Sequence, residues 1–303
     1  MFDIPIEAKK NIIRTQGEHG KAFFDNLSQR LDKYITKWKL YECNFLAHST
    51  NLIYACKSDI YGDVVIKAGV PEDGRLFTEV STLMFYNDKA HMCKLYDYSL
   101  EDGFLLFERA MPGITLKDAI PDPMNRAEIF VDIFEHYHLP CDDNTTYPTY
   151  ISLIEAFANN MDSYPDFIKY KDITRRIYYE INNHYSRKYL LHGDLHFRNI
   201  LSHGKMFKVI DPHGIIGDPI FDITRFLSNE LSDAIRENRS FNSDVLLFIG
   251  KSLGIPNSIL FGLLVIDVTH HAGYHLGNPI TKSIYDFNLK RCKTAYELYL
   301  SAL

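Results

Sequence analysis

Residues Leu190 to Gly214 read LLHGDLHFRNILSHGKMFKVIDPHG. Short apolar runs alternate in this stretch with His, Asp and Asn. Asp194 stands five residues before Asn199, and Asp211 follows directly after the apolar run that ends at Ile210. The pattern is compatible with a metal site, with a phosphoryl-transfer site, or with polar residues that line a turn and cap two helices.

Phosphoryl transfer from ATP needs three groups from such a stretch. A carboxylate must orient the attacking hydroxyl and accept its proton, and an amide oxygen and a second carboxylate must hold Mg²⁺ against the phosphates. An Asp-x-x-x-x-Asn loop followed by an Asp at a strand end supplies these groups in kinase-type sites. Asp194 is therefore the predicted catalytic base, and the hard oxygen ligands of Asn199 and Asp211 favour Mg²⁺ over zinc.

Two upstream residues complete the pattern. Lys67 ends an alternating apolar strand in DVVIKAG, where a phosphate-binding lysine is expected, and Glu79 follows on the next predicted helix. A surface ion pair is the alternative interpretation, because such pairs are common. Four elements in the order of a kinase site are nevertheless more specific than any one of them.

The composition fits a soluble globular enzyme. The chain has 303 residues, 46% hydrophobic and 24% charged, and at this length two lobes are expected. A net charge of -6 without a Lys/Arg-rich run argues against nucleic-acid binding. No secretory signal and no membrane span are evident, so we expect a cytoplasmic protein. The five scattered cysteines lack a C-x-x-C pair and predict neither a disulfide framework nor a zinc site.

Hydrophobic periodicity predicts an α+β fold with two lobes. The first forty residues read as helix, 44–58 and 63–69 as strands, 74–88 as a helix and 93–110 as a hairpin. The helix over 74–88 is predicted to bury one face, made of Phe77, Val80, Leu83 and Met84. Further helices are expected near 125–137, 149–161, 172–186, 219–236, 243–253 and 257–273. Residues 1–110 would form N-terminal helices and a small antiparallel-sheet N-lobe that binds nucleotide, and 111–303 a larger, mostly helical C-lobe.

Together these motifs resemble the aminoglycoside phosphotransferase superfamily, which has a protein-kinase-like fold, and most closely its streptomycin 6-kinase and hydroxyurea phosphotransferase branch. The resemblance covers most of the chain, through VVIKAGVP, TEVSTLMF, FLLFERAMPGITL, LLHGDLHFRNIL and VIDPHGIIGDPIFDITRFL. His192-Gly193-Asp194 stands where protein kinases have His-Arg-Asp. That difference, and the GDPIFD segment after Asp211, separate this group from protein kinases.

The resemblance implies an ATP- and Mg²⁺-dependent kinase, with GTP as the alternative donor. Its acceptor would be a hydroxyl of a small, streptomycin-like aminoglycoside, which phosphorylation would inactivate. Lys67, paired with Glu79, would contact the α- and β-phosphates. The other implied positions are the adenine hinge at Phe107, Glu108, Arg109 and Ala110, the phosphate loop at Ser49, Thr50 and Asn51, and His192 and Asp222 as supports of the catalytic loop.

Two departures from the family pattern stand out. The phosphate loop AHSTN has no glycine, and Phe197-Arg198 occupies a place where relatives usually have Pro-Gly. The alternatives are a kinase of a choline-like, aminosugar, thiosugar or hydroxyurea-type acceptor, or a nucleotide-binding module without catalysis. The oligomeric state stays open. Two lesser hypotheses concern zinc at His270, His271 and His275, and a cationic acceptor bound by Asp142, Asp143, Glu155 and Asp162.

Overall fold

A computed structural model describes residues 4–48, 50–71, 73–86, 89, 91–142, 146–277 and 280–303. The chain divides into two compact units. The N-terminal unit comprises residues 1–113 and 202–210, and the C-terminal unit comprises 114–201 and 211–303. An antiparallel sheet in the first unit and a mostly helical second unit confirm the predicted α+β class.

The sheet of the N-terminal unit has the order β1-β2-β3-β5-β4, and neighbouring strands are antiparallel. The predicted hairpin over 93–110 is confirmed, and its turn holds Gly103 at a φ of 74°. That left-handed conformation is open to glycine at little cost. The strand bounds are β1 Leu40–His48, β2 Leu52–Ser58, β3 Gly62–Ala68, β4 Leu95–Ser99 and β5 Phe104–Glu108.

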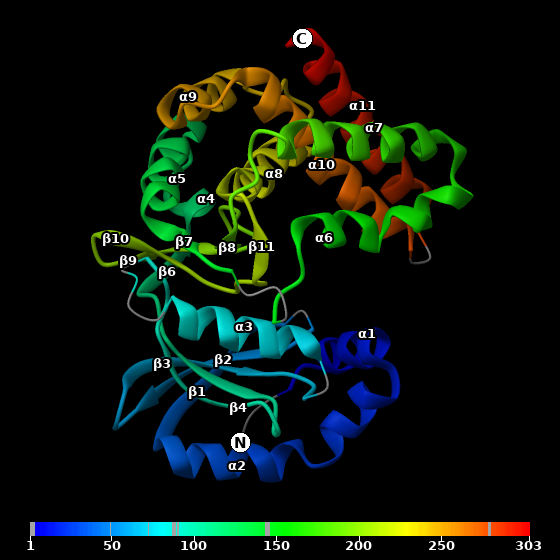
Figure 1. The fold of residues 1–303 in the computed structure, drawn as a ribbon. Helices are drawn as coiled ribbons and strands as arrows, with labels where there is room; N and C mark the ends of the chain where they lie inside the picture. Colours follow the sequence, from blue (N-terminus) through cyan, green and yellow to red (C-terminus); the bar gives the residue numbers. More distant parts are fainter. Residues whose placement is uncertain are drawn as a thin grey trace. The chain divides into compact units, whose positions relative to one another are not determined.

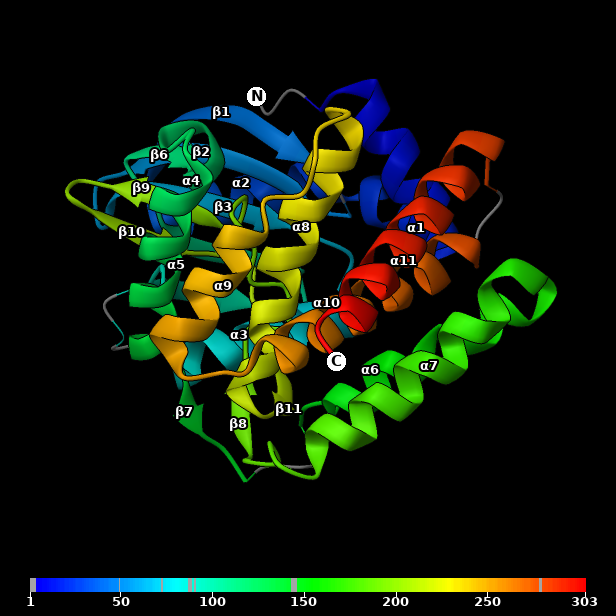
Figure 2. The ribbon, with the colours of Figure 1, turned by 90° about the horizontal axis from the view of Figure 1, so that it is seen from above.

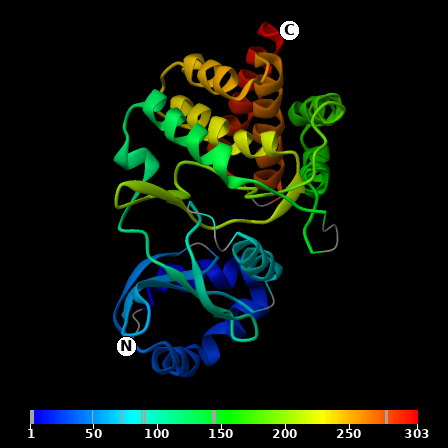
Figure 3. The ribbon, with the colours of Figure 1, turned by 60° about the vertical axis from the view of Figure 1, so that its left-hand side comes forward.

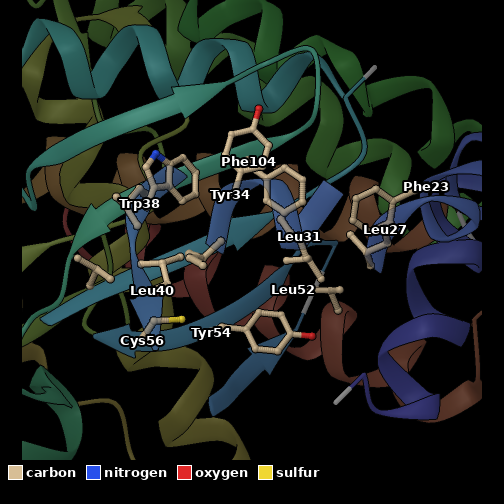
Figure 4. Close-up of a cluster of buried hydrophobic side chains, with 14 of the residues drawn as sticks. Phe23, Leu27, Leu31, Tyr34, Trp38, Leu40, Leu52, Tyr54, Cys56 and Phe104 are labelled. Atoms are coloured by element: carbon tan, nitrogen blue, oxygen red, sulfur yellow. The ribbon is translucent and has the colours of Figure 1, made fainter. Parts of the chain in front are cut away.

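Helix α2 (Leu27–Trp38) lies along one face of this sheet, and α1 (Ile6–Asp25), which precedes it, curves past the end of the sheet (Figure 1). The predicted single helix is thus interrupted twice, at Gly17, whose φ is 57°, and at Asn26. The apolar stripe of α2 packs against every second residue of β3, because successive strand side chains point to opposite faces. Figure 4 shows this buried cluster, which includes Leu31, Tyr34, Trp38, Leu52, Tyr54 and Phe104.

Helix α3 (Gly74–Phe85) covers the opposite face of the sheet (Figure 3). Its buried side is formed by Leu76, Glu79, Val80 and Leu83. The predicted buried face was therefore wrong for Phe77 and Met84, whose exposed fractions are 49% and 56%. The reason is that Glu79 turns inward to meet a strand lysine, which rotates residues 77 and 84 outward.

A disulfide bond joins Cys43 of β1 to Cys56 of β2. The scattered cysteines predicted no disulfide framework, and for this pair that prediction was wrong. The two residues are 13 positions apart, but the antiparallel pairing of β1 with β2 brings their Cα atoms within 4.1 Å. The other cysteines, Cys93, Cys141 and Cys292, are free and buried.

The C-terminal unit is built around α10 (Asn257–Leu276), which packs against α7 (Pro165–Asn182), α8 (Ile223–Arg236) and α11 (Lys282–Ser301), as Figure 2 shows. The remaining helices are α4 (Leu116–Ala119), α5 (Pro123–Tyr137), α6 (Tyr150–Ala156) and α9 (Ser243–Leu253). Short 3-10 helices occupy Ala158–Ser163 and Pro219–Asp222. Sequence periodicity missed α11, because polar Asn288 and Arg291 lie on its buried side among few apolar residues.

No single helix of the described ranges is long and apolar enough to cross a membrane. Helices α9 and α10 pass that test of length and composition only when taken together, and they are bent by 119° at their junction.

Two small sheets carry the stretch from Leu190 to Gly214. Strand β8 (Tyr189–Leu191) lies between β7 (Leu139–Pro140) and β11 (Ile215–Gly217), antiparallel to both. Strands β9 (Ile200–His203) and β10 (Met206–Val209) form the second sheet together with β6 (Pro112–Thr115). Because Leu191 pairs with Ile215, the loop that follows β8 begins beside the segment that precedes β11.

Candidate active site

The β8–β11 pair brings two parts of the candidate site together. The backbone N–H of His213 donates to the carbonyl of His192 over 2.7 Å. Gly193 has a φ of 78°, and a Cβ there would lie 2.5 Å from an isoleucine side chain of β11, so this turn requires glycine. Asp211 also has a positive φ, 61°, which is uncommon for a residue with a side chain and clusters at functional sites.

Asp222 holds the start of the loop after β8, which is the predicted catalytic loop. Its carboxylate accepts hydrogen bonds from the backbone N–H groups of His192 (2.7 Å) and Gly193 (2.8 Å), and its Oδ2 lies 2.9 Å from His138 Nε2. The side chain is almost fully buried, so these donors offset its desolvation. His192, also buried, accepts a hydrogen bond at Nδ1 from the backbone N–H of Asp194. The structure thus brings Asp222 and His192 together around the loop.

Asp194 is surrounded by donors. Its Oδ1 accepts a hydrogen bond from Arg225 Nε over 2.7 Å, and its Oδ2 lies 3.3 Å from Asn199 Nδ2 and 3.4 Å from His196 Nε2. Burial alone would raise the pKa of this carboxyl, but the charge of Arg225 and the hydrogen bond of His196 outweigh burial and hold the pKa well below its usual range. Asp194 is therefore a fixed, ionised carboxylate at neutral pH.

Asn199 has a defined orientation. Its Nδ2 lies 3.0 Å from the Asp194 carbonyl and 3.3 Å from the Asp194 carboxylate, so the amide oxygen points away from both acceptors. That oxygen and the carboxylate of Asp211 are hard donors of the kind Mg²⁺ prefers. Among the described residues no group of three or more His, Cys, Asp or Glu side chains is arranged to hold a metal. Mg²⁺ needs fewer protein ligands, because it keeps waters and phosphate oxygens, so the two residues fit it.

The packing of Phe197 explains why the first residue of the unusual Phe197-Arg198 pair is a phenylalanine. Its ring is fully buried against Phe226 of α8, with ring centroids 6.2 Å apart. The Lys117 amine and the Arg126 guanidinium lie 5.7 Å from the centre of the Phe197 ring. Arg198, by contrast, has an exposed side chain. Phe197 thus anchors the middle of the loop after β8 in the helical core, a role that neither Pro nor Gly can take.

The N-terminal unit contains the second candidate group. Lys67 Nζ, on β3, donates to Glu79 Oε2, on α3, over 2.6 Å. The two side chains are 8% and 7% exposed, so the alternative of a surface ion pair does not hold. Burying two charges is costly and adds little net stability in general. A buried lysine–glutamate pair in an otherwise apolar sheet layer therefore favours a functional interpretation.

The predicted phosphate loop connects β1 and β2. Ser49 lies outside the described residues, Thr50 is half-buried, and Asn51 is 9% exposed. Asn51 Oδ1 is buried and accepts no hydrogen bond within the described part of the chain. A Cβ at Gly69 would lie 2.1 Å from this oxygen, so Gly69 makes the room that Asn51 occupies. In place of glycines, the loop thus carries a buried polar amide that still lacks a partner for its oxygen.

The predicted hinge comprises the last two residues of β5 and the two that follow them. Phe107 pairs with Val65 in the sheet, and the carboxylate of Glu108 binds Lys208 Nζ (3.1 Å) and the backbone N–H of Lys94 (3.2 Å). Because that carboxylate is engaged, recognition of a base in this segment would use backbone groups. Arg109 donates its backbone N–H to Asp63, and Ala110 is buried.

The histidines near the end of α10 have protein partners. His271 Nδ1 lies 3.1 Å from the Asp267 carbonyl, and His275 Nδ1 lies 3.1 Å from Asn288 Oδ1. The ring of His270 packs on Phe157. His270 Nδ1 is buried without a hydrogen-bond partner in the described part of the chain, so polar contacts account for His271 and His275 only.

Of the acids considered for a cationic acceptor, two are neutralised by neighbours. Glu155 pairs with Arg175, and Asp162 pairs with Lys171. Asp142 is exposed, and Asp143 lies outside the described residues.

Sequence reasoning missed Arg225 and Asp267, which contact each other beside Asp194. One signal was available. Arg225 stands three residues after Asp222, a spacing that places both on one side of a helix start.

The sequence matches one protein-family model, described as aminoglycoside/hydroxyurea antibiotic resistance kinase, over residues 65–249. The matched span contains Lys67, Glu79 and the whole stretch from Leu190 to Gly214. A search of the curated proteins found no match.

Solved structures of kinases have a similar fold. Choline kinase LicA from Streptococcus pneumoniae has a TM-score of 0.67 and 13% identity, covering 91% of this chain and 100% of that one. Plasmodium vivax ethanolamine kinase has a TM-score of 0.65 and 12% identity, covering 99% and 96%. A thermostable mutant of aminoglycoside phosphotransferase APH(4)-Ia, in a ternary complex with ADP and hygromycin B, has a TM-score of 0.61 and 12% identity, covering 88% and 97%. These likenesses confirm the predicted kinase-like fold.

Proposed function

Because the chain belongs to the aminoglycoside/hydroxyurea antibiotic resistance kinase family, we propose that it transfers the γ-phosphoryl group of ATP to a hydroxyl of an aminoglycoside-type antibiotic. The observation that carries the proposal is the environment of Asp194. A single carboxylate, fixed by Arg225 and Asn199 and kept ionised, is suited to orient a hydroxyl group for attack on phosphorus.

In the proposed reaction the acceptor hydroxyl donates a hydrogen bond to Asp194. Its oxygen forms a bond to the γ-phosphorus while the bond from that phosphorus to the β–γ bridging oxygen breaks, and ADP leaves. The hydroxyl proton passes to Asp194 and then to solvent. Since the pKa of Asp194 is held low, the carboxylate acts mainly by orientation and takes the proton late.

The remaining residues bind the nucleotide in this proposal. Lys67, held by Glu79, would bind the α- and β-phosphates, and the amide of Asn51 would meet a phosphate group. Backbone groups of residues 107–110 would bind the adenine. Asn199 and Asp211 would hold Mg²⁺, which when bound neutralises phosphate charge. ATP is a cytoplasmic metabolite, so we place the activity in the cytoplasm.

The acceptor is proposed from the family and not from a pocket. Glu155 and Asp162 are already paired with cations, so a polycationic acceptor would have to be bound by other carboxylates, such as exposed Asp142. Choline-like, aminosugar, thiosugar and hydroxyurea-type acceptors are therefore included in the test.

The experiment is an acceptor panel with ATP and Mg²⁺, read by mass spectrometry. We expect a gain of one phosphoryl group on an aminoglycoside, with streptomycin as the first candidate, and matching formation of ADP. Phosphorylation of only a non-aminoglycoside hydroxyl would support the kinase activity but contradict the proposed aminoglycoside acceptor. No turnover with any acceptor, together with a nucleotide-induced thermal shift, would favour a binding module instead.

A further inference from the structure

Arg225 forms a bridge between the candidate catalytic carboxylate and the central helix of the C-terminal unit. Its Nε donates to Asp194 Oδ1 over 2.7 Å, and its Nη1 donates to Asp267 Oδ2 on α10 over 3.3 Å. The same Nη1 lies 3.3 Å from His271 Nδ1. The guanidinium thus uses two different edges for two carboxylates on separate elements.

The three side chains of this bridge are largely shielded from solvent. The side chains of Arg225, Asp194 and Asp267 are 15%, 18% and 3% exposed. Burial alone would lower the pKa of Arg225, but the charges of Asp267 and Asp194 outweigh burial and keep it above its usual range. The guanidinium is therefore charged, and its two carboxylates hold it from opposite sides.

The first turns of α8 hold the catalytic loop at two points. Asp222, the residue directly before α8, accepts the backbone N–H groups of His192 and Gly193. Arg225, three residues later, binds the side chain that the same loop presents. One contact fixes the loop backbone and the other fixes the rotamer of Asp194, so a single rigid element sets both.

We propose that Arg225 is a positioning residue for phosphoryl transfer, and that Asp267 anchors it so that Asp194 presents its carboxylate to the acceptor in one orientation. The inference rests on the proposed function, because Asp194 is the proposed base. Asp194 Oδ2 faces Asn199 and His196, and Oδ1 faces Arg225. Each oxygen of a carboxylate has two lone pairs, so Oδ1 keeps one for the acceptor hydroxyl while Arg225 occupies the other.

The kinetic test compares the full-length wild type with Arg225→Ala, Arg225→Lys and Asp267→Asn. We expect Arg225→Ala to lower kcat by about 100-fold, the size of effect that a misplaced catalytic group produces. KM for ATP should change less than about twofold, because Arg225 is not assigned to the nucleotide. Arg225→Lys keeps the charge but not the two-edged geometry, so it should stay at least about tenfold impaired. Added guanidinium should partly rescue Arg225→Ala, and added methylammonium should not.

The matched control is Arg236→Ala, which removes an exposed arginine from the same helix and should leave kcat unchanged. Near-wild-type kcat in a folded Arg225→Ala protein would overturn the inference and leave the proposed function intact. No turnover by the wild type would instead overturn the proposed function.

A crystal structure of Arg225→Ala decides the positioning claim without any activity. We expect the Asp194 side chain to leave its wild-type rotamer or to become disordered. An unmoved Asp194 side chain would overturn the inference even if turnover were lost. Should Arg225→Ala fail to fold, the structures of Arg225→Lys and Asp267→Asn answer the same question.

Discussion

The guanidinium of Arg225 lies against the carboxylate of Asp194, with 2.7 Å between Nε and Oδ1. The two residues belong to separate elements, α8 and the loop after β8, and their contact fixes a side chain that local sequence leaves free. Asp222 holds the backbone of the same loop. Orientation of one carboxylate thus depends on a helix that follows the loop in the chain.

Variants of the buried Lys67–Glu79 pair should affect the stability and the activity of the protein differently. Replacing Lys67 alone by Met removes the cationic partner of a buried carboxylate and should cost about 3–5 kcal/mol of unfolding free energy. The double variant Lys67→Met/Glu79→Leu should recover most of that loss, because an apolar pair suits the site, yet transfer should stay lost in both. Urea unfolding and ADP formation measure the two effects. Recovered transfer in the double variant would show that Lys67 does not bind phosphate.

Asp211→Asn tests the proposed magnesium ligands. The variant keeps the shape of the side chain but removes its charge, so we expect the half-saturating Mg²⁺ concentration to rise by about 10–100-fold. The measurement is the rate against free Mg²⁺ at fixed ATP. Asp244→Asn, on the exposed start of α9, is the control and should leave the curve unchanged. An unchanged curve for Asp211→Asn would contradict the assignment.

Asp222→Asn tests the support of the catalytic loop. The carboxylate faces the backbone N–H groups of His192 and Gly193 and the Nε2 of His138. An amide in its place has only one oxygen, so its own N–H group would face one of these groups and lose a hydrogen bond. We expect a loss of about 1–3 kcal/mol of unfolding free energy and a lower kcat with little change in KM for ATP. Thermal unfolding and steady-state kinetics check this. An unchanged free energy of unfolding in Asp222→Asn would mean that the loop does not depend on these hydrogen bonds.

His270 predicts a pH dependence of stability. Burial, together with the charge of His271, lowers the pKa of His270 from 6.5 to about 3. The unfolded chain therefore binds a proton where the folded protein does not, so the contribution of this group to stability is present above pH 6.5 and is lost as the pH falls from 6.5 towards 3. Because of this group, the free energy of unfolding should fall by at most about 1.4 kcal/mol for each pH unit in this interval.

Urea unfolding between these pH values measures the slope. His270→Asn should flatten it, whereas His184→Asn, at an exposed position, should not. Equal slopes in the wild type and His270→Asn would contradict the assignment of this effect to His270.

Local patterns predicted much of the fold. Strands with alternating residues and helices with a regular apolar stripe, such as α2, lie where periodicity placed them. The face of α3 was mispredicted because Glu79 is buried by its charge partner and not by hydrophobicity. The Cys43–Cys56 bond depends on strand pairing, and the buried polar side of α11 carries no apolar periodicity.

In the candidate site, too, local patterns predicted some residues, and contacts between distant segments determined the others. The order of Lys67, Glu79, Asp194, Asn199 and Asp211 along the chain was enough to nominate them, because each stands at a recognisable strand end, helix or loop. The contact of Arg225 with Asp194 and Asp267 joins three elements, and local sequence indicates only that Arg225 shares one side of a helix start with Asp222. Phe197 likewise became interpretable only once its ring was seen packed on Phe226.

The catalytic role of Asp194 is tested by the transfer of radiolabelled phosphate from [γ-³²P]ATP to the acceptor, measured for the wild type and for Asp194→Ala. We expect wild-type transfer, a loss of at least about 100-fold in the variant, and an equal rise in Tm of both proteins with AMP-PNP and Mg²⁺. Near-wild-type transfer by Asp194→Ala would contradict the account.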